Sequence, residues 1–492
     1  MSKSLSPFLT VMVAMLLVMA ACTPSPEDVR QSDAWPEIYP DYTDVWIPSN
    51  IAPLNFMLRD DRCDAIQVVA RQAGGTSKNA TVVTIQAKGR KAIFDTSEWH
   101  DLIGHAGTVE VAVTARISGE WVAYKPFLWH VVADQLDPYL TYRLIEPDYE
   151  IYQNLTLRER CIESFDERAI SDYGLVGNRC MNCHTYGSQS PDLSMLYIRG
   201  EGGGAILNQE GKLTKLNIKT DDMVSGSVYF GFNPSGRYIT FSSNVIIPAF
   251  HAQPHKRLEV YDSASDVYIA DLESKTILRS PLLSDSLAYE TFPTFSPDGH
   301  HVYYCAAPPT MLPDGLKQMR YNLCRIAFDE TTGTIGNEVD TLYNGRTEGH
   351  SVCHPRISPD GRWLVYTIAD YGTFPIWHTE SDLQLMDLRN GHTDPMTVVN
   401  SRKSDTYHSW SSNSRWLVFA SKRDDGLYGK PYFTYIDSHG KAHKPFVLPQ
   451  RDPEYYDNCL KSFNAPELGR GRLPFDAYDV KKAVDSEVVK FK

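Results

Sequence analysis

Short runs in which apolar and polar residues alternate fill the chain from about residue 45 to 138. Three of them read ATVVTIQAKG (80–89), TVEVAVTARI (108–117) and WVAYKPFLWHVV (121–132), and the turn SGE separates the last two. A period of two is typical of strands that bury one face. The runs therefore predict a small antiparallel β-sandwich over 45–138.

The alternation stops between residues 139 and 200. In YQNLTLRERCIESFDERAIS (152–171), apolar residues from Leu155 to Phe165 fall near helical spacing, with paired charges between them. Such spacing predicts an amphipathic helix, which we place over 152–170.

Beyond residue 200 a pattern of strand, four-residue turn and strand recurs. Its four copies are GFNPSGRYITFSSN (231–244), PTFSPDGHHVYYCAA (293–307), PRISPDGRWLVYTIA (355–369) and HSWSSNSRWLVFASK (408–422). Proline presets the first turn angle, Asp or Ser bonds back to the backbone, and Gly relieves strain at the exit. The turn prolines Pro234, Pro297 and Pro359 lie 63 and 62 residues apart. A repeat of about 40 to 60 residues with four strands predicts a β-propeller of five or six blades.

Charge and the N-terminal residues indicate the compartment. The net charge of −13 with no basic patch argues against nucleic-acid binding. The uncharged run FLTVMVAMLLVMAAC (8–22) is too short to span a bilayer and is typical of an export signal. Small residues before Cys22 resemble a bacterial lipobox, so we expect Cys22 to be lipidated and to anchor the protein to a membrane of the cell envelope, in the periplasm or at the outer membrane. The Pro-rich and acidic stretch that follows is typical of a tether.

The repeats resemble the TolB-like propeller repeat, and the whole chain resembles bacterial lipoproteins that join an N-terminal β-domain, a cytochrome c-type CxxCH segment and such a propeller. The likeness is carried by IAPLNF, YRLIEPDYEIY, CMNCHTY, RGEGGG, ISPDGRWLVYT, IWHTESDL, YHSWSSNSRWLVFASKRDDG and KPFVLPQRDPEYYD. The strand pattern of 45–138 predicts a sandwich of immunoglobulin or fibronectin type III kind, and the resemblance implies a mainly β fold in which this β-domain precedes the propeller. The expected segments are a signal peptide (1–22), a tether (23–44), the sandwich (45–138), a helical segment with the haem motif (139–200), the propeller (201–450) and a C-terminal extension (451–492).

The motif CMNCH (180–184) carries the chemistry of the chain. With no second CxxC elsewhere, the motif supplies at most three zinc ligands, and no βαβ unit surrounds it as in thioredoxin-type dithiols. In an exported chain, CxxCH fits one covalent haem c, with both thiols bonded to the vinyl groups and the imidazole on the iron. Cys180 and Cys183 are the predicted attachment sites, and His184 is the predicted proximal ligand. A plain structural disulfide between the two cysteines is the alternative.

The second axial ligand and the other cysteines are less constrained. Strands resume soon after the motif, so neighbouring segments must cover the haem, and candidates for the sixth ligand are Met195, His251, His378 and His408. Cys305 and Cys324 lie on successive predicted strands, which an exported protein can join by a disulfide. Sequence does not decide the pairing of Cys63, Cys161, Cys353 and Cys459.

Three classes of function remain open. The first is a membrane-tethered electron-transfer protein whose propeller docks a protein partner. The second is a haem-free TolB-like binding module of the envelope, with CxxCH as a clip. The third, an enzyme, is disfavoured because the chain has no GxSxG or HExxH motif, although an open haem iron would permit peroxidase chemistry.

Overall fold

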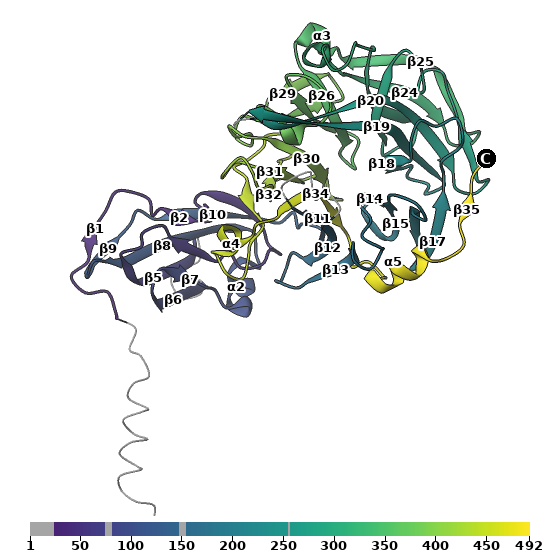
Figure 1. Cartoon of the computed structure of the whole chain (residues 1–492). Helices are drawn as coiled ribbons and strands as arrows, with labels where there is room; N and C mark the ends of the chain where they lie inside the picture. Colours follow the sequence, from purple (N-terminus) through teal and green to yellow (C-terminus); the bar gives the residue numbers. More distant parts are fainter. Residues whose placement is uncertain (1–23, 74–80, 147–153, 254–255) are drawn as a thin grey trace, which may run out of the picture. The chain divides into compact units, whose positions relative to one another are not determined.

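The computed structural model describes residues 24–73, 81–146, 154–253 and 256–492, so Cys22 and the predicted signal peptide lie outside the described residues. The described chain is mainly β and divides into two compact units (Figure 1). Unit 1 comprises residues up to Val45, Pro53–Val131 and Pro449–Tyr455. Unit 2 comprises Trp46–Ala52, Val132–Leu448 and Tyr456–Lys492. Strand β3 (Val45–Pro48) lies where the chain passes from one unit to the other.

The described residues of unit 1 form two sheets and the helix α2. The larger sheet is formed by β1 (Arg30–Gln31), β5 (Cys63–Ala73), β6 (Val82–Lys88), β8 (Gly107–Ile117), β9 (Glu120–Ala123) and β10 (Phe127–Val132). The smaller sheet is formed by β2 (Ile38–Tyr39), β4 (Phe56–Leu58) and β7 (Lys91–Ala92). Helix α2 (Thr96–Ile103) begins at Asp95, whose carboxylate accepts hydrogen bonds from two backbone amides. The predicted alternation is confirmed in β8, where Val109, Val111, Val113 and Ala115 are buried.

Six sheets make up unit 2. The first is β13-β12-β11-β34, the second β14-β15-β16-β17-β35, and the other four are each built from consecutive strands, β18–β21, β22–β25, β26–β29 and β30–β33. The strands of the first and second sheets are β11 (Tyr139–Ile145), β12 (Leu155–Cys161), β13 (Glu167–Asp172), β34 (Ser462–Gly469), β14 (Met181–Gly187), β15 (Ser190–Ile198), β16 (Gly204–Gln209), β17 (Lys212–Asn217) and β35 (Val489–Lys490). Those of the third and fourth are β18 (Ser227–Phe232), β19 (Tyr238–Gln253), β20 (Lys256–Asp271), β21 (Thr276–Leu278), β22 (Tyr289–Phe295), β23 (His301–Ala307), β24 (Asn322–Asp329) and β25 (Thr334–Tyr343). Those of the fifth and sixth are β26 (Ser351–Ile357), β27 (Trp363–Ala369), β28 (Asp382–Asp387), β29 (His392–Asp394), β30 (Asp405–Trp410), β31 (Trp416–Ser421), β32 (Lys430–Tyr435) and β33 (Phe446–Val447).

The sheets of unit 2 form a closed ring, which is the arrangement of a β-propeller (Figure 1). Each sheet has one edge strand at the centre, and these inner strands contact one another in the order β14, β18, β22, β26, β30, β34 and back to β14. Because β34 comes from near the C-terminus and pairs with β11, the first sheet joins both ends of unit 2. Ring closure protects sheet edges that would otherwise pair with other chains.

The predicted turns connect the first and second strands of four sheets. In the fifth sheet, the Ser358 hydroxyl bonds to Asp360 and accepts from the Trp363 amide, and Gly361 has a φ of 72°. The copy in the sixth sheet has no Gly, and Ser414 takes the same left-handed backbone with a φ of 62°. The side-chain bonds of Ser411 to Asn413 and Trp416 therefore hold the turn without Pro or Gly.

Two sequence-based predictions about unit 2 are wrong. The helix expected over 152–170 is replaced by β12 and β13, because Leu155 and Leu157 are buried at a period of two and β12 pairs with both β11 and β13. The segment 139–200 is therefore part of the ring rather than a helical insert. The segment 451–492 is not an extension beyond the propeller, because it supplies β34 and β35.

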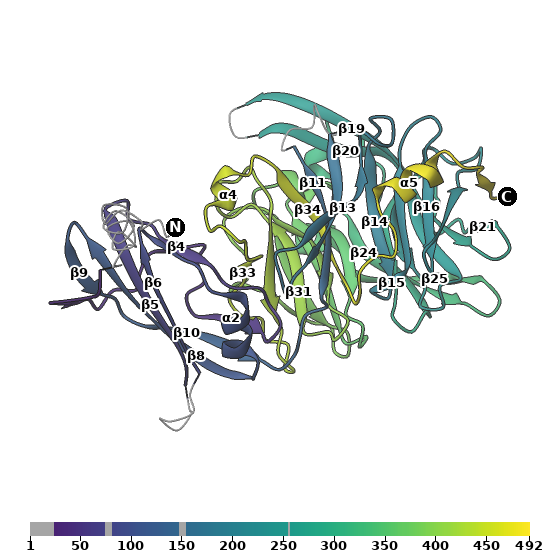
Figure 2. The same cartoon turned by 90° about the horizontal axis from the view of Figure 1, so that it is seen from below.

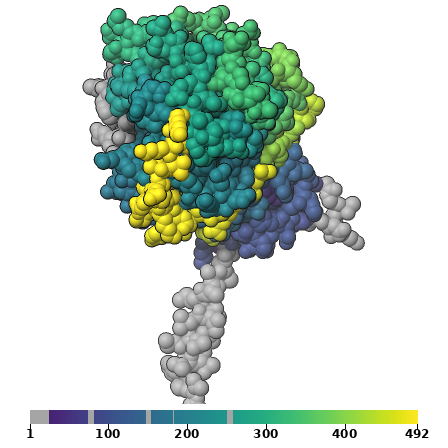
Figure 3. All heavy atoms as spheres, turned by 90° about the vertical axis from the view of Figure 1, so that its right-hand side faces the viewer, coloured from purple at the N-terminus to yellow at the C-terminus, as the bar shows by residue number. Residues whose placement is uncertain are grey.

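Short helices and one long hairpin complete unit 2. The helices are η2 (Leu316–Gln318), α3 (Gly345–Glu348), η3 (Pro375–Trp377), α4 (Tyr455–Asn458) and α5 (Ala477–Val484). Helix α5 packs against β13, β16 and β17, and Figure 3 shows this C-terminal segment, in yellow, on the surface of the teal strands. Strands β19 and β20 form a hairpin that projects from the ring (Figure 2).

Candidate functional site

The CMNCH motif lies at the centre of the ring. Cys180 directly precedes β14, the inner strand of the second sheet, and Cys183 and His184 lie within that strand. Asn182 pairs with Tyr197 and His184 with Leu196, so Cys183 is the extra residue of a β-bulge. The motif therefore has strand geometry with one irregularity, at its second cysteine.

The same irregularity recurs in every inner strand. Each of the six has one non-glycine residue with a left-handed backbone, at φ values between 47° and 60°, next to a shift in strand register. These residues are Cys183, Tyr229, Phe292, His354, Tyr407 and Ala465, which we call the axial ring. Left-handed backbone is uncommon outside glycine, and bulges of this kind redirect side chains near functional sites.

Side chains of the axial ring contact one another around the axis. Ring centroids are 4.5 Å apart for Tyr229 and Phe292, 4.1 Å for Phe292 and His354, and 4.6 Å for His354 and Tyr407. The backbone N–H of Tyr229 donates to Cys183 Sγ at 3.3 Å. In the cyclic order of the inner strands, Cys183 and His354 occupy opposite positions.

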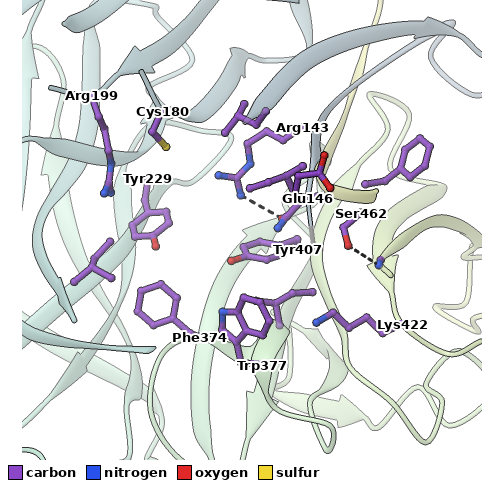
Figure 4. Close-up of a pocket in the computed structure, with 17 residues that line it drawn as sticks. Arg143, Glu146, Cys180, Arg199, Tyr229, Phe374, Trp377, Tyr407, Lys422 and Ser462 are labelled. Carbon is purple, nitrogen blue, oxygen red and sulfur yellow. Dashed lines mark hydrogen bonds between the residues drawn. The ribbon is translucent and has the colours of Figure 1, made fainter. Parts of the chain in front are cut away.

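A cavity of about 910 Å³, which includes space open to solvent, lies where the inner strands begin (Figure 4). Its wall includes Cys180 and two members of the axial ring, Tyr229 and Tyr407. The remaining lining is largely apolar, with three cationic side chains and one carboxylate; it consists of Arg143, Ile145, Glu146, Leu155, Arg199, Ile246, Phe374, Ile376, Trp377, Lys422, Gly429, Ser462, Phe463 and Asn464. The first cysteine of the motif therefore faces the central cavity.

The cations of the wall change the chemistry of their neighbours. Burial raises the pKa of the Cys180 thiol, and the positive charges of Arg199 and Arg143 oppose this shift. Arg199 also donates its backbone N–H to the Cys180 carbonyl at 2.9 Å. Burial lowers the pKa of Lys422 to about 8, with Asp425 opposing that shift. Lys422 therefore changes its charge near neutral pH.

His184 is held as a neutral imidazole. Burial lowers its pKa to about 3, and the charge of Arg143 adds to the effect. Both ring nitrogens are shielded from solvent, and neither has a hydrogen-bond partner of good geometry among the described residues. A contact with the Thr141 backbone opposes the lowering of the pKa, and the neutral imidazole that results is the form that binds metals.

The predicted candidates for a sixth ligand do not line this cavity. Met195 is 2% exposed and packs in the core between the second and third sheets. His378 Nδ1 lies 2.9 Å from Glu380 Oε1, and its Nε2 lies 3.5 Å from Glu259 Oε1. His408 Nε2 lies 2.9 Å from the Val365 carbonyl oxygen and donates to it. The side chain of His251 lies outside the described residues.

A second cavity of about 1100 Å³ lies at the other end of the inner strands. Its lining includes the predicted turns at Pro234, Pro297 and Pro359, together with Arg356 and Glu467. Glu467 accepts from the Tyr186 backbone N–H at 2.9 Å and from the Thr185 hydroxyl at 3.2 Å, and burial raises its pKa to about 7. The axial ring thus has an apolar, cationic cavity on one side and a more polar one on the other.

The predicted disulfide between Cys305 and Cys324 is wrong. Cys305 pairs with Leu323 and Cys324 with Tyr304, so the two thiols point to opposite faces of one sheet. They accordingly belong to different core clusters, and both are free. None of the eight cysteines in the described part of the chain is in a disulfide, and this includes Cys180 and Cys183.

Several residues of the site belong to no motif with an assigned chemistry, although they lie in segments that carry the family resemblance, YRLIEPDYEIY, RGEGGG, IWHTESDL and YHSWSSNSRWLVFASKRDDG. Arg143, Arg199, Lys422 and Trp377 come from four separate segments, and only ring closure brings them together. The axial ring is also invisible in sequence, because its members share backbone geometry rather than residue type. The signal that could have found it is position, since His354 and Tyr407 each stand four residues before the first Ser of the following turn, at Ser358 and Ser411.

Searches of the described residues give two further results. No group of three or more His, Cys, Asp or Glu side chains there is arranged to hold a metal ion by itself. No helix in the same residues has the length and apolar character needed to cross a membrane.

Comparison with known proteins adds little beyond fold. No model of a known family and no curated protein matches the chain. Among solved structures, a puromycin hydrolase matches with 10% identity and a TM-score of 0.38, over 62% of this chain and 45% of that protein. Oligogalacturonate lyase in complex with manganese matches with 11% identity and a TM-score of 0.36, over 63% of this chain and 72% of the lyase. The β-propeller domain of the Trilobed protease from Pyrococcus furiosus matches with 8% identity and a TM-score of 0.34, over 69% of this chain and 82% of the domain.

This chain spans less than half the length of the puromycin hydrolase that it matches. At these identities and TM-scores, the similarities carry no argument about activity. The contacts between the inner strands of unit 2 are what define it as a closed ring.

Proposed function

We propose that this protein carries one covalent c-type haem at the central cavity of its propeller and transfers single electrons to a docked protein partner. The observation that carries the proposal is the position of CMNCH: it lies on an inner strand, and Cys180 lines the cavity. A motif that served only as a structural clip would not need to lie at the centre of the ring.

The residues present fit a haem in three respects. Neither Cys180 nor Cys183 is in a disulfide, as thioether formation requires. Burial lowers the pKa of His184 and keeps its imidazole neutral, which is the form that binds iron. The cavity combines apolar and aromatic walls with cations, which suits a flat apolar macrocycle with two carboxylates.

When bound, the haem would supply a one-electron redox couple whose potential depends on its axial ligand and surroundings. The protein's part is to hold and shield the group. Cys180 and Cys183 would attach it, His184 would bind the iron, and Phe374 and Trp377 would exclude water from the cavity. The left-handed backbone at Cys183 interrupts strand alternation, so the second thiol is not fixed to the face that a regular strand would impose.

The finer architecture belongs to the same proposal. The six sheets of unit 2 would be six blades of a TolB-like propeller, and the two sheets of unit 1 would be a sandwich of immunoglobulin or fibronectin type III kind. Lipidation at Cys22 would tether the protein to a membrane of the envelope, where the haem would exchange electrons with a protein partner.

A haem-free binding module is the second candidate function. It is favoured by the strand geometry of the motif, since haem c motifs need both thiols and the imidazole close to one porphyrin, and β14 directs His184 and Cys183 differently. In that case the central cavity would bind a free ligand.

Haem staining on a denaturing gel separates the two candidates. Protein made with a haem c maturation system should stain, because thioether bonds survive denaturation. The double substitution Cys180→Ser with Cys183→Ser should abolish the stain, whereas Cys161→Ser, which changes another free and partly exposed cysteine, should retain it. Wild-type protein that does not stain would favour the binding module.

A further inference from the structure

The central cavity has an excess of positive charge. Among the described residues, its wall contains the cations Arg143, Arg199 and Lys422 and one carboxylate, Glu146, which lies 3.6 Å from the ammonium of Lys461. The cations come from the first, second and sixth sheets, so the ring places them around one space. Cations gathered in a concave apolar site attract anions more strongly than the same charges on an open surface.

Lys422 provides a second observation that points to a ligand. Its side chain is 7% exposed, and Figure 4 shows it directed into the cavity beside Trp377. The ammonium lies 4.5 Å from the centroid of the Trp377 ring, and no carboxylate of the described residues lies within salt-bridge distance of it. A buried ammonium without a carboxylate is costly, so an anion in the cavity would relieve that cost.

The rest of the wall defines the body of the ligand. Tyr229 and Tyr407 of the axial ring form its floor, and Trp377 lies to one side (Figure 4). Aromatic faces of this kind favour a flat apolar group stacked against them. The cations therefore favour an anionic group, and the aromatic rings favour a flat apolar group in the same ligand.

We infer that the cavity binds a flat, largely apolar ligand that carries carboxylates, with the carboxylates on Arg143, Arg199 and Lys422 and the apolar body against Trp377, Tyr229 and Tyr407. If the proposed function holds, this ligand is the attached haem and the carboxylates are its two propionates. That identification rests on the proposed function, whereas the ligand class rests on the cavity alone.

A matched pair of probes tests the ligand class on full-length wild-type protein made without haem maturation. The probes are 1-pyrenebutyrate and 1-pyrenebutanol, which share a flat aromatic body and differ in the carboxylate. Binding is followed by probe fluorescence. The carboxylate should bind about tenfold or more tightly than the alcohol, because a charge-assisted hydrogen bond supplies roughly that factor. Equal affinities would overturn the inference.

Substitutions locate the site. Lys422→Met should remove most of the preference for the carboxylate, and affinity for pyrenebutyrate in the wild type should fall as the pH rises above about 8, where Lys422 loses its charge. Lys430→Met is the matched control, because Lys430 is equally buried, is paired with Asp424 and does not line the cavity. A loss of carboxylate preference in Lys430→Met but not in Lys422→Met would contradict the assignment.

Haem-loaded protein shows whether the carboxylates that bind in the cavity are the haem propionates or belong to a free molecule. If the haem propionates bind Arg143, Arg199 and Lys422, haem-loaded protein should not bind pyrenebutyrate. If loaded and unloaded protein bind it equally, the ligand class stands and the natural ligand is a free molecule, while the placement of the propionates is overturned. A wild type that never acquires haem but binds the carboxylate selectively would defeat the proposed function without affecting this inference.

Discussion

At the scale of single residues, the left-handed backbone at Cys183 decides how the motif is presented. In a regular strand, residues separated by an odd number of positions face opposite sides, and the bulge breaks this rule within CMNCH. Cys180 reaches the cavity, Cys183 joins the axial ring, and the nitrogens of His184 are buried. The three side chains thus have different environments despite their closeness in sequence.

His184→Ala should keep the haem attached but change its electronic state. Both thioethers would survive, so gel staining should persist, while the Soret band and the reduction potential should shift because the axial ligand tunes the iron. His408→Ala is the control, since its imidazole is buried but bonded to the Val365 carbonyl. Unchanged spectra in His184→Ala, or a larger change in His408→Ala, would exclude His184 as the proximal ligand.

Asp262 should make stability depend on pH. This fully buried carboxyl on β20 accepts from Asn244 and Thr373, and burial raises its pKa from 3.8 to about 7. The folded state therefore binds a proton that the unfolded state has released between about pH 4 and 7, so the free energy of unfolding falls as the pH rises through that window. One proton contributes at most about 1.4 kcal/mol per pH unit.

Asp262→Asn should make this decline shallower in urea unfolding measured from pH 4 to 8, by up to about 1.4 kcal/mol per pH unit, while Glu467, whose pKa burial also raises to about 7, keeps its own contribution. On the same strand, Arg237 holds the pKa of Asp271 below its ordinary range, so the stability from that carboxylate is lost only as the pH falls below about 4. Asp271→Asn should therefore leave the decline from pH 4 to 7 in place. A decline of unchanged steepness in Asp262→Asn would contradict the contribution assigned to Asp262.

At the scale of elements, β34 is the strand on which ring closure depends. Phe463 on this strand is 1% exposed and lies 4.8 Å from the Tyr142 ring of β11 and 5.9 Å from the Tyr456 ring, measured between centroids. Truncating a buried Phe to Ala typically costs about 3–5 kcal/mol. Phe463→Ala should lower the free energy of unfolding by about that amount.

The comparison variant for Phe463→Ala is Tyr478→Ala in α5, whose side chain is 64% exposed and should cost much less. Both are measured by urea denaturation followed with tryptophan fluorescence. Equal effects of the two substitutions would indicate that β34 contributes little to closure.

The sequence predicted elements wherever the local pattern and the final contacts agree. The alternation of β8 and the turn chemistry around Ser358 and Asp360 are local, and the structure confirms both. The segment 152–170 was predicted as a helix because its charges fall between apolar residues, but pairing of β12 with two neighbours sets its structure. The buried pair of Glu159 and Arg168, 2.7 Å apart, shows how a strand can bury charges that a helix would expose.

The candidate site was predictable only in part for the same reason. CMNCH is a local motif and was found, whereas the cavity cations and the axial ring depend on contacts between distant segments. The disulfide predicted for Cys305 and Cys324 required the strand register, which sequence spacing does not give.

At the scale of the whole molecule, the first prediction concerns the attachment of the protein to a membrane. Cys22→Ser should move the protein from the membrane fraction to the soluble fraction, because lipidation is the anchor that the sequence predicts. Fractionation followed by immunoblotting checks this, with Cys63→Ser as a control that leaves the lipobox intact. Membrane association that persists in Cys22→Ser would refute the lipid anchor.

The central claim is that one haem is bonded to each chain through Cys180 and Cys183. Intact mass spectrometry of denatured wild-type protein, made with and without the haem c maturation system, tests it most directly. The account predicts that maturation adds the mass of one haem per chain, and that the Cys180→Ser, Cys183→Ser variant gains none. Identical masses for the two wild-type preparations would contradict the account.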